Sequence, residues 1–121
     1  GLVSDDYYKA GLAVNQDLRR DRAASEGHYR AQIMFAPDRG RVRVLLNGDT
    51  LPGQLALKIT HPTRAGTDQS VMLVQSSPGL YKAAVQPVAM GAWILALESS
   101  DWRLSGTWHA GKDSAVQLMA R

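Results

Sequence analysis

The sequence predicts a mainly β fold, an immunoglobulin-like antiparallel β-sandwich with one N-terminal amphipathic helix. From residue 28 onward, apolar and polar residues alternate in short runs, which is the period of strands with one buried face. About eight such runs follow one another at roughly 8–12-residue intervals, separated by Gly, Pro, Asn and Asp, as is typical of antiparallel sandwiches. Helical spacing occurs only before them. We therefore expect a helix within residues 1–27 and a β-sandwich domain over residues 28–121.

The helix is predicted over residues 4–26. Ser4 can cap its first turn, because the hydroxyl accepts a backbone N–H bond, and Gly27 can end it. An apolar stripe recurs at helical spacing and consists of Tyr7, Gly11, Val14 and Leu18. The opposite face is expected to point into water and carries Lys9, Asp17, Arg20 and Asp21. The apolar stripe needs a surface to lie on, and the sandwich supplies one.

The first three strands are predicted at residues 29–35, 42–46 and 54–61. In the second of them, Val42, Val44 and Leu46 alternate with positions that face outward. The dipeptide Asn47-Gly48 that follows is the strongest short turn signal in the chain. Pro62 ends the third strand, because proline has no N–H to donate to a ladder.

The core is predicted to be built on residues 78–108. Three runs within this stretch, at 80–85, 93–97 and 102–108, hold all three tryptophans of the chain. Large aromatic side chains dominate the energetics of a small core. Alternate positions place the following residues on one apolar wall: Tyr81, Ala83, Val85, Trp93, Leu95, Leu97, Trp102, Leu104 and Trp108. Further strands are expected at residues 68–75 and 114–120.

The composition of the chain argues against several classes of function. The chain has 121 residues, enough for a single core, and 14 basic against 11 acidic residues give a net charge of +3. With no cysteine, the chain has no disulfide, no thiolate nucleophile and no cysteine metal site. No nucleic-acid motif or basic stripe with interleaved aromatics is visible, so we expect no nucleic-acid partner. No run approaches the ~18–20 apolar residues of a membrane span.

Three stretches carry a resemblance to a known family. The first is residues 4–18, Ser-Asp-Asp-Tyr-Tyr-Lys-Ala-Gly-Leu-Ala-Val-Asn-Gln-Asp-Leu; the second is His61-Pro62-Thr63 with Asp68. The third is Pro78-Gly-Leu-Tyr81, followed by Gly91-Ala-Trp93 and Asp101-Trp102. With these motifs the chain resembles the soluble part of the FixH family, over most of its length.

The resemblance implies a place in the cell and a role. FixH-like proteins are inner-membrane proteins with one N-terminal span and a periplasmic β-sandwich domain. They are linked to the maturation of a high-affinity haem-copper cytochrome oxidase, beside an iron–sulfur membrane protein and a copper-transporting ATPase. By this resemblance Gly1 follows a membrane span that the sequence omits, and the partners are oxidase-assembly proteins or oxidase subunits. The family has no settled set of catalytic residues to carry over.

A copper site is the metal hypothesis that the resemblance raises. The available ligands are His28, His61, His109, Met34, Met72, Met90 and Met119, and thioethers suit Cu(I) while imidazoles suit Cu(II). No His-x-His, Met-x-x-Met or Glu-x-x-His spacing occurs. His61 and Met90 are the best candidates, because both flank turns. The competing interpretation, which we favour, is that His61 bonds a loop backbone group or Asp68 and that the methionines fill gaps in the core. We therefore expect no bound cofactor.

Catalytic chemistry finds little support. The chain has no Gly-x-Ser-x-Gly, no Gly-x-Gly-x-x-Gly and no P-loop lysine, and capping of the helix explains the pair Asp5-Asp6. We expect no enzyme and no catalytic residues. The partner-binding candidates are instead Tyr7 and Tyr8 on the helix, and Arg41 and Arg43 on the outer face of a strand. For the tyrosines the alternative is a half-buried ring on the sandwich edge, and for the arginines a solvated surface.

These observations favour a non-catalytic docking module that assists oxidase assembly and copper supply. Two alternatives stay open: a copper-binding metallochaperone with His and Met ligands, and a general protein- or carbohydrate-binding β-sandwich.

Overall fold

The structure is a computed structural model that describes residues 15–64 and 66–120. Within them the chain is helical over residues 15–26 and then forms eight strands. The strands are β1 (Arg30–Phe35), β2 (Arg41–Asn47), β3 (Gln54–Thr60), β4 (Gln69–Ser77), β5 (Leu80–Ala84), β6 (Gly91–Glu98), β7 (Arg103–Ala110) and β8 (Ala115–Met119). The predicted mainly β fold with an N-terminal helix is confirmed.

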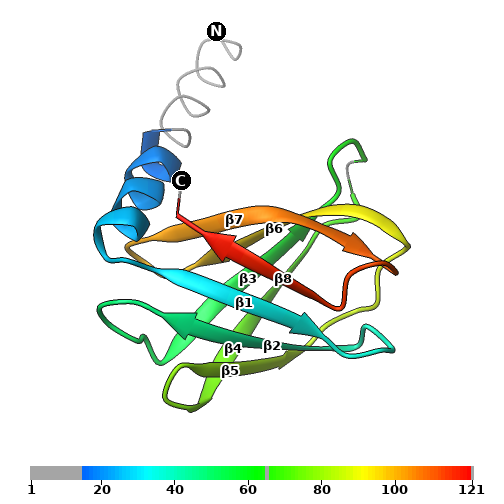
Figure 1. Ribbon diagram of the computed structural model, residues 1–121. Coiled ribbons are helices and arrows are strands. Elements are labelled where there is room, and N and C mark those ends of the chain that lie inside the picture. Colours follow the sequence, from blue (N-terminus) through cyan, green and yellow to red (C-terminus); the bar gives the residue numbers. More distant parts are fainter. Residues whose placement is uncertain (1–14, 65, 121) are drawn as a thin grey trace, which may run out of the picture.

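All strand pairs are antiparallel, and they form one sheet in the order β7-β6-β3-β4-β5-β2-β1-β8. The segment β1-β2-β5-β4 has the order of strands A-B-E-D of an immunoglobulin domain, and β3-β6-β7 has the order of strands C-F-G. Pairing of β3 with β4 joins the two halves, and β8 extends the first half beyond β1. Figure 1 shows the sheet curving back on itself, so that the two halves enclose the core.

The core contains the predicted apolar wall, but in a different arrangement. Eight of its nine residues are buried: Tyr81, Val85, Trp93, Leu95, Leu97, Trp102, Leu104 and Trp108, and Ala83 is half-buried. In the sheet, β3 and β4 lie between β5 and β6. The residues therefore belong to two facing halves rather than to one wall. Contact between the halves includes the ring of Phe35 in β1, which stacks on Trp108 in β7 with centroids 3.7 Å apart.

The helix meets the sandwich at Tyr29, whose ring stacks on Trp102 with centroids 4.3 Å apart. A Cβ added to Gly27 would lie 2.3 Å from the Tyr29 ring, and one added to Gly48 would lie 2.0 Å from it. The helix ends before Gly27, as predicted, but it is His28 that adopts the left-handed φ of 58°. Gly27 is therefore required by its contact with the tyrosine ring, and not by its backbone conformation.

The predicted faces of the helix are partly wrong. Leu18, placed on the apolar stripe, is 57% exposed, whereas Ala24 is completely buried. Arg20 and Asp21, placed in water, contact charged groups of β6 and β7. Ion pairing with the sheet thus determines which way this part of the helix faces. The other stripe residues, Tyr7, Gly11 and Val14, lie outside the described residues.

The two ends of the strand order, β7 and β8, lie against each other. They approach closely at Gly106, where an added Cβ would lie 2.6 Å from Cδ2 of Leu118. This contact closes the sandwich along one side. In the described part of the chain, no helix has the length and apolar character needed to cross a membrane.

Candidate docking surface

Charged side chains gather in two regions, and the first surrounds Glu98 at the end of β6. Glu98 is only 7% exposed. Its Oε1 lies 3.2 Å from Nη2 of Arg20 and 3.3 Å from Nε of Arg103, and its Oε2 lies 3.2 Å from Nζ of Lys58. A buried carboxylate is costly unless it is paired. Three cations from the helix, β3 and β7 meet that need.

Two further ion pairs fasten the helix to this Glu98 cluster. Asp21 on the helix lies 3.3 Å from Nη1 of Arg103, and Asp17 lies 2.5 Å from Nη2 of Arg20. Burial opposes the charged form of Arg20, but the hydrogen bond that Arg20 donates to Asp17 and the attraction of Glu98 outweigh it and raise the pKa of Arg20. Every charge in the Glu98 cluster has a partner. The cluster therefore holds the helix in place and leaves no free charge for a ligand.

The second region is the outer surface of β1, β2, β4, β5 and β8. None of these five strands contains an aspartate or glutamate. They do contain four basic residues: Arg30, Arg41, Arg43 and Lys82. Among residues 15–64 and 66–120, the ion pairs involve none of these four side chains. Positive charge is thus concentrated on this half of the sheet without neutralisation from its own strands.

The strand register places two of these cations side by side. Arg43 in β2 is directly opposite Lys82 in β5, and Met34 and Val74 extend the same row on either side. Arg41 is the next outward residue of β2. We call the surface of Met34, Arg41, Arg43, Val74 and Lys82 the basic face. Like charges directly opposite in a sheet are destabilising, so the pairing of Arg43 with Lys82 does not serve the stability of the fold.

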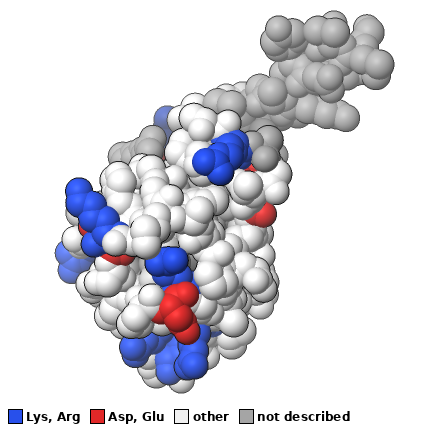
Figure 2. Space-filling model, turned by 90° about the vertical axis from the view of Figure 1, so that its right-hand side faces the viewer, with Lys and Arg blue, Asp and Glu red and all other residues white. Residues whose placement is uncertain are grey.

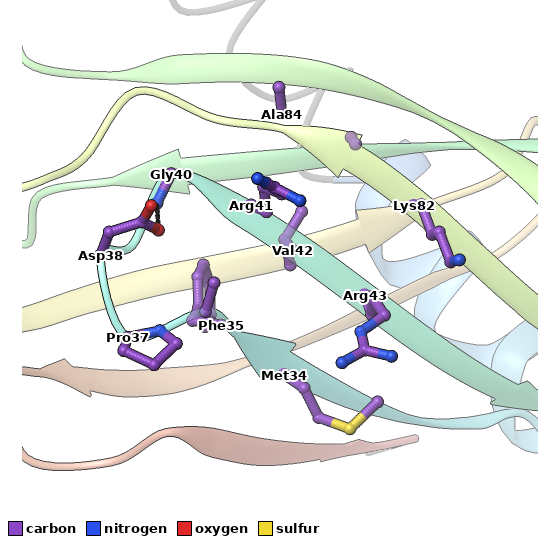
Figure 3. Close-up of a pocket in the computed structure, with 12 residues that line it drawn as sticks. Met34, Phe35, Pro37, Asp38, Gly40, Arg41, Val42, Arg43, Lys82 and Ala84 are labelled. Carbon is purple, nitrogen blue, oxygen red and sulfur yellow. Dashed lines mark hydrogen bonds between the residues drawn. The ribbon is translucent and has the colours of Figure 1, made fainter.

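An open groove of about 1050 Å³ runs along the basic face. Figure 3 shows Arg41, Arg43 and Lys82 on neighbouring strands around it. One acidic residue, Asp38, lines the groove, and its carboxylate accepts the backbone N–H of Gly40 at 2.9 Å. Figure 2, which views the molecule from the right-hand end of Figure 1, likewise shows more basic than acidic surface. The groove is therefore suited to a negatively charged group.

Apolar side chains accompany the cations. Val74 is 62% exposed, Met72 is 53% exposed and Leu45 is 41% exposed. Val74 lies opposite Lys82. Leu45 lies opposite Leu80, and this pair is the next outward-facing pair after Arg43 and Lys82. Exposed apolar side chains next to unpaired charges are more typical of a protein-binding surface than of a surface that contacts only water.

Each of the two candidate metal ligands has contacts of its own within the chain. Nδ1 of His61 accepts the backbone N–H groups of Thr63 at 3.1 Å and Arg64 at 3.0 Å, and the His61 backbone N–H donates to Asp68 at 3.4 Å. These are the loop and Asp68 bonds that the competing interpretation expected. Its expectation that the methionines fill gaps in the core is wrong, because Met72, Met90 and Met119 are 53%, 73% and 57% exposed. Met90 is 73% exposed and lies over Gly111. Within residues 15–64 and 66–120, no three His, Asp or Glu side chains are placed to share a metal ion.

Of the predicted partner-binding residues, Arg41 and Arg43 lie on the outer face of β2, as expected. Tyr7 and Tyr8 lie outside the described residues. Sequence reasoning missed Lys82, although its outward position in a strand and the lack of acidic residues in the neighbouring strands could have revealed it. It also missed Glu98, whose partners are brought together only by the fold.

Comparison with known protein families gives a match over most of the chain. A model of the FixH family matches residues 1–109 of the chain. No curated protein and no solved structure matches it.

Proposed function

The chain belongs to the FixH family, and from this premise we propose that it is a non-catalytic docking domain that assists assembly of a haem-copper cytochrome oxidase. In this proposal the domain is held at the inner membrane by an N-terminal span and works on the periplasmic side. Its partners are oxidase subunits or other assembly proteins. Its contribution to copper supply is indirect, because it brings the proteins that carry copper to the oxidase.

The observation that supports the proposal is the unpaired positive charge of the basic face. Arg43 and Lys82 face each other across two strands, and no carboxylate of the described residues pairs with either. Keeping two like charges opposite each other costs stability. A partner with negative charge would relieve that repulsion on binding, and charge complementarity of this kind speeds association and selects the partner.

The Glu98 cluster supports the same proposal from the other end of the molecule. Ion pairs from Arg20 and Asp21 to the sheet fix the direction in which the helix leaves the sandwich. The helix lies at one end of the sheet, and the turn that leads into Arg41 lies at the other (Figure 1). A span that precedes the helix would thus hold the basic face away from the membrane surface, where another protein can reach it.

A complementation experiment in the native host tests the proposal. Deleting the gene should lower the amount of assembled oxidase, measured from its haem spectrum, together with the copper content of the purified oxidase. The wild-type gene should restore both, and the variant Arg41→Glu/Arg43→Glu should not. The control is Arg64→Glu, which reverses a single exposed charge in the β3–β4 loop, away from the basic face. Full restoration by the Arg41/Arg43 variant would rule out docking through the basic face.

Copper titration separates this proposal from the metallochaperone alternative. The purified chain is titrated with Cu(I) and with Cu(II). The same titrations of His61→Ala and Met90→Ala show whether either residue is needed for binding. We expect no stoichiometric site tighter than about micromolar, because Nδ1 of His61 already accepts two backbone N–H groups. A tight site that either substitution removes would favour a metallochaperone.

A further inference from the structure

We propose that the basic face binds an extended acidic segment of a partner protein, with carboxylates at alternate positions followed by an apolar residue. This inference rests on the proposed docking function and specifies the chemistry of the docked segment. The spacing of the charges, the residues next to them and the place of the face on the sheet all favour such a segment.

The spacing fits an extended chain. Arg41 and Arg43 point to the same side of β2, so their Cα atoms are roughly 6.6–6.8 Å apart along the strand. Side chains at alternate positions of an extended peptide repeat at the same interval. Lys82 is beside Arg43 on the next strand, roughly 4.8 Å away in the hydrogen-bonding direction. One carboxylate can therefore meet Arg41, and the next can sit between Arg43 and Lys82.

The surface changes from charged to apolar along the same two strands. The next outward pair after Arg43 and Lys82 is Leu45 and Leu80, and Leu45 is 41% exposed. A segment lying along β2 that presents two carboxylates would place its next inward-facing side chain over these two leucines. Burial of an apolar side chain there adds affinity that salt does not screen.

The place of the face on the sheet favours a protein over an anionic lipid surface. Arg41 begins β2 and Asn47 ends it, a strand of seven residues, which spans roughly 20 Å. Asn47 is opposite Arg30, the first residue of β1 after the helix. The charged part of the face is thus at the far end of the sheet from the helix. A bilayer that holds the preceding span would meet the helix end of the domain first.

The test uses the full 121-residue chain and a labelled peptide, Ser-Glu-Thr-Glu-Thr-Leu-Ser, together with its reversed sequence, since the segment can run either way along β2. The control peptides carry Gln in place of both Glu. Binding is measured by fluorescence anisotropy at low salt and at 0.5 M NaCl, and the site is mapped from amide chemical shifts. Vesicles of phosphatidylglycerol and of phosphatidylcholine form the lipid arm.

We expect one of the Glu peptides to bind, with shifts confined to β2, β5 and their neighbours and with affinity that falls at high salt. The Gln peptides should bind at least about tenfold more weakly, as should either Glu peptide to Arg43→Glu/Lys82→Glu. Arg64→Glu should bind like the wild type. Binding that is equal for Glu and Gln peptides, or unaffected by the double substitution, would overturn the inference. So would capture by phosphatidylglycerol vesicles that depends on Arg43 and Lys82.

The complementation experiment keeps this inference distinct from the proposed function. If the Arg41/Arg43 variant fails to support oxidase assembly but neither Glu peptide binds, docking stands and the acidic segment is wrong. If a Glu peptide binds as expected and the variant supports normal assembly, the segment is right and the docking role in oxidase assembly is wrong.

Discussion

The Glu98 cluster and the basic face use the same kinds of side chain in opposite ways. Around Glu98, three cations converge on one buried carboxylate, and Asp17 and Asp21 pair with two of them. On the basic face, Arg43 and Lys82 lie opposite each other without a carboxylate in their strands. The first arrangement satisfies its own charges and stabilises contacts within the chain. The second leaves charge unsatisfied, and an external group can complete it.

The difference shows that counting charges does not reveal their role. Arg103 and Arg43 are both strand arginines of the same sheet. Arg103 is paired twice, with Asp21 and Glu98, while Arg43 faces a lysine. Whether a basic residue is structural or available is decided by what lies opposite it in the register. Four measurements on stability test this distinction.

The largest effect is expected for Glu98→Ala. Removing the carboxylate leaves Arg20 and Arg103 without their shared partner, and breaking a buried ion pair costs up to about 3–5 kcal/mol. Both arginines keep some contact with water, with side chains 26% and 22% exposed, so we expect a loss of about 2–3 kcal/mol. Urea unfolding measures it. Glu26→Ala, an exposed change on the helix, is the control and should stay within about 0.5 kcal/mol. Equal losses would contradict a structural role for Glu98.

A smaller effect is the coupling between Glu98 and each cation in double-mutant cycles. We expect Glu98 and Arg103 to couple by about 1–2 kcal/mol, because Arg103 is largely buried and also holds Asp21. Lys58 is 49% exposed, and its coupling should be below about 1 kcal/mol. Unfolding free energies of the single and double alanine variants give both numbers. A stronger coupling to Lys58 than to Arg103 would show that the ion pair with β3, and not the one with β7, contributes more to the stability of the cluster.

Lys82→Glu should be stabilising, in contrast to the changes at Glu98. The substitution replaces a like-charge pair with an ion pair opposite Arg43, and cross-strand pairs of this kind differ by about 0.2–1 kcal/mol. Thermal and urea unfolding measure the gain, with Arg64→Glu as the charge-matched control. The same variant should lose the docking of acidic peptides. A stabilised protein that no longer docks would show directly that Lys82 is kept at the expense of stability.

The smallest effect is the response to salt. Raising NaCl from 0.1 to 1 M shortens the screening length from about 10 Å to about 3 Å. The stability difference between Lys82→Glu and the wild type should then shrink to a few tenths of a kcal/mol, because these charges are exposed. The loss caused by Glu98→Ala should change little, since Glu98 is 7% exposed. Parallel unfolding series at both salt concentrations provide the comparison. If both differences shrank equally, the two regions would be electrostatically alike.

Most of the sheet could be predicted from the sequence because its cause is local. Val42, Val44 and Leu46 alternate with outward residues in β2, and all three are buried. Turn residues such as Asn47-Gly48 fix where the strands end. The same alternation correctly placed Trp93 and Trp108 in the core. It could not show that the predicted wall is divided between two halves of the sheet, because that depends on strand order.

The two charged regions were harder to predict for different reasons. Asp21 and Arg103 are 82 positions apart, so only the folded chain brings the Glu98 cluster together. This is also why Arg20 and Asp21 were wrongly placed in water and Leu18 in the apolar stripe. On the basic face, alternation placed Arg41 and Arg43 outward correctly. What the sequence pattern could not reveal was the pairing of β2 with β5, which places Lys82 opposite Arg43.

The close approach of Gly106 to Leu118 has a consequence for self-association. β7 and β8 end the strand order, and no further described strand is bonded to the outer side of either. A Cβ atom at position 106 would lie 2.6 Å from Cδ2 of Leu118, so this buried side chain would have to shift. If β8 shifted with it, β7 and β8 would separate while most of the core stayed intact. Unpaired edge strands can pair with strands of other molecules. Separation of β7 from β8 would therefore be expected to cause aggregation of nearly native molecules. The absence of a Cβ atom at position 106 thus helps to keep these two edge strands close together.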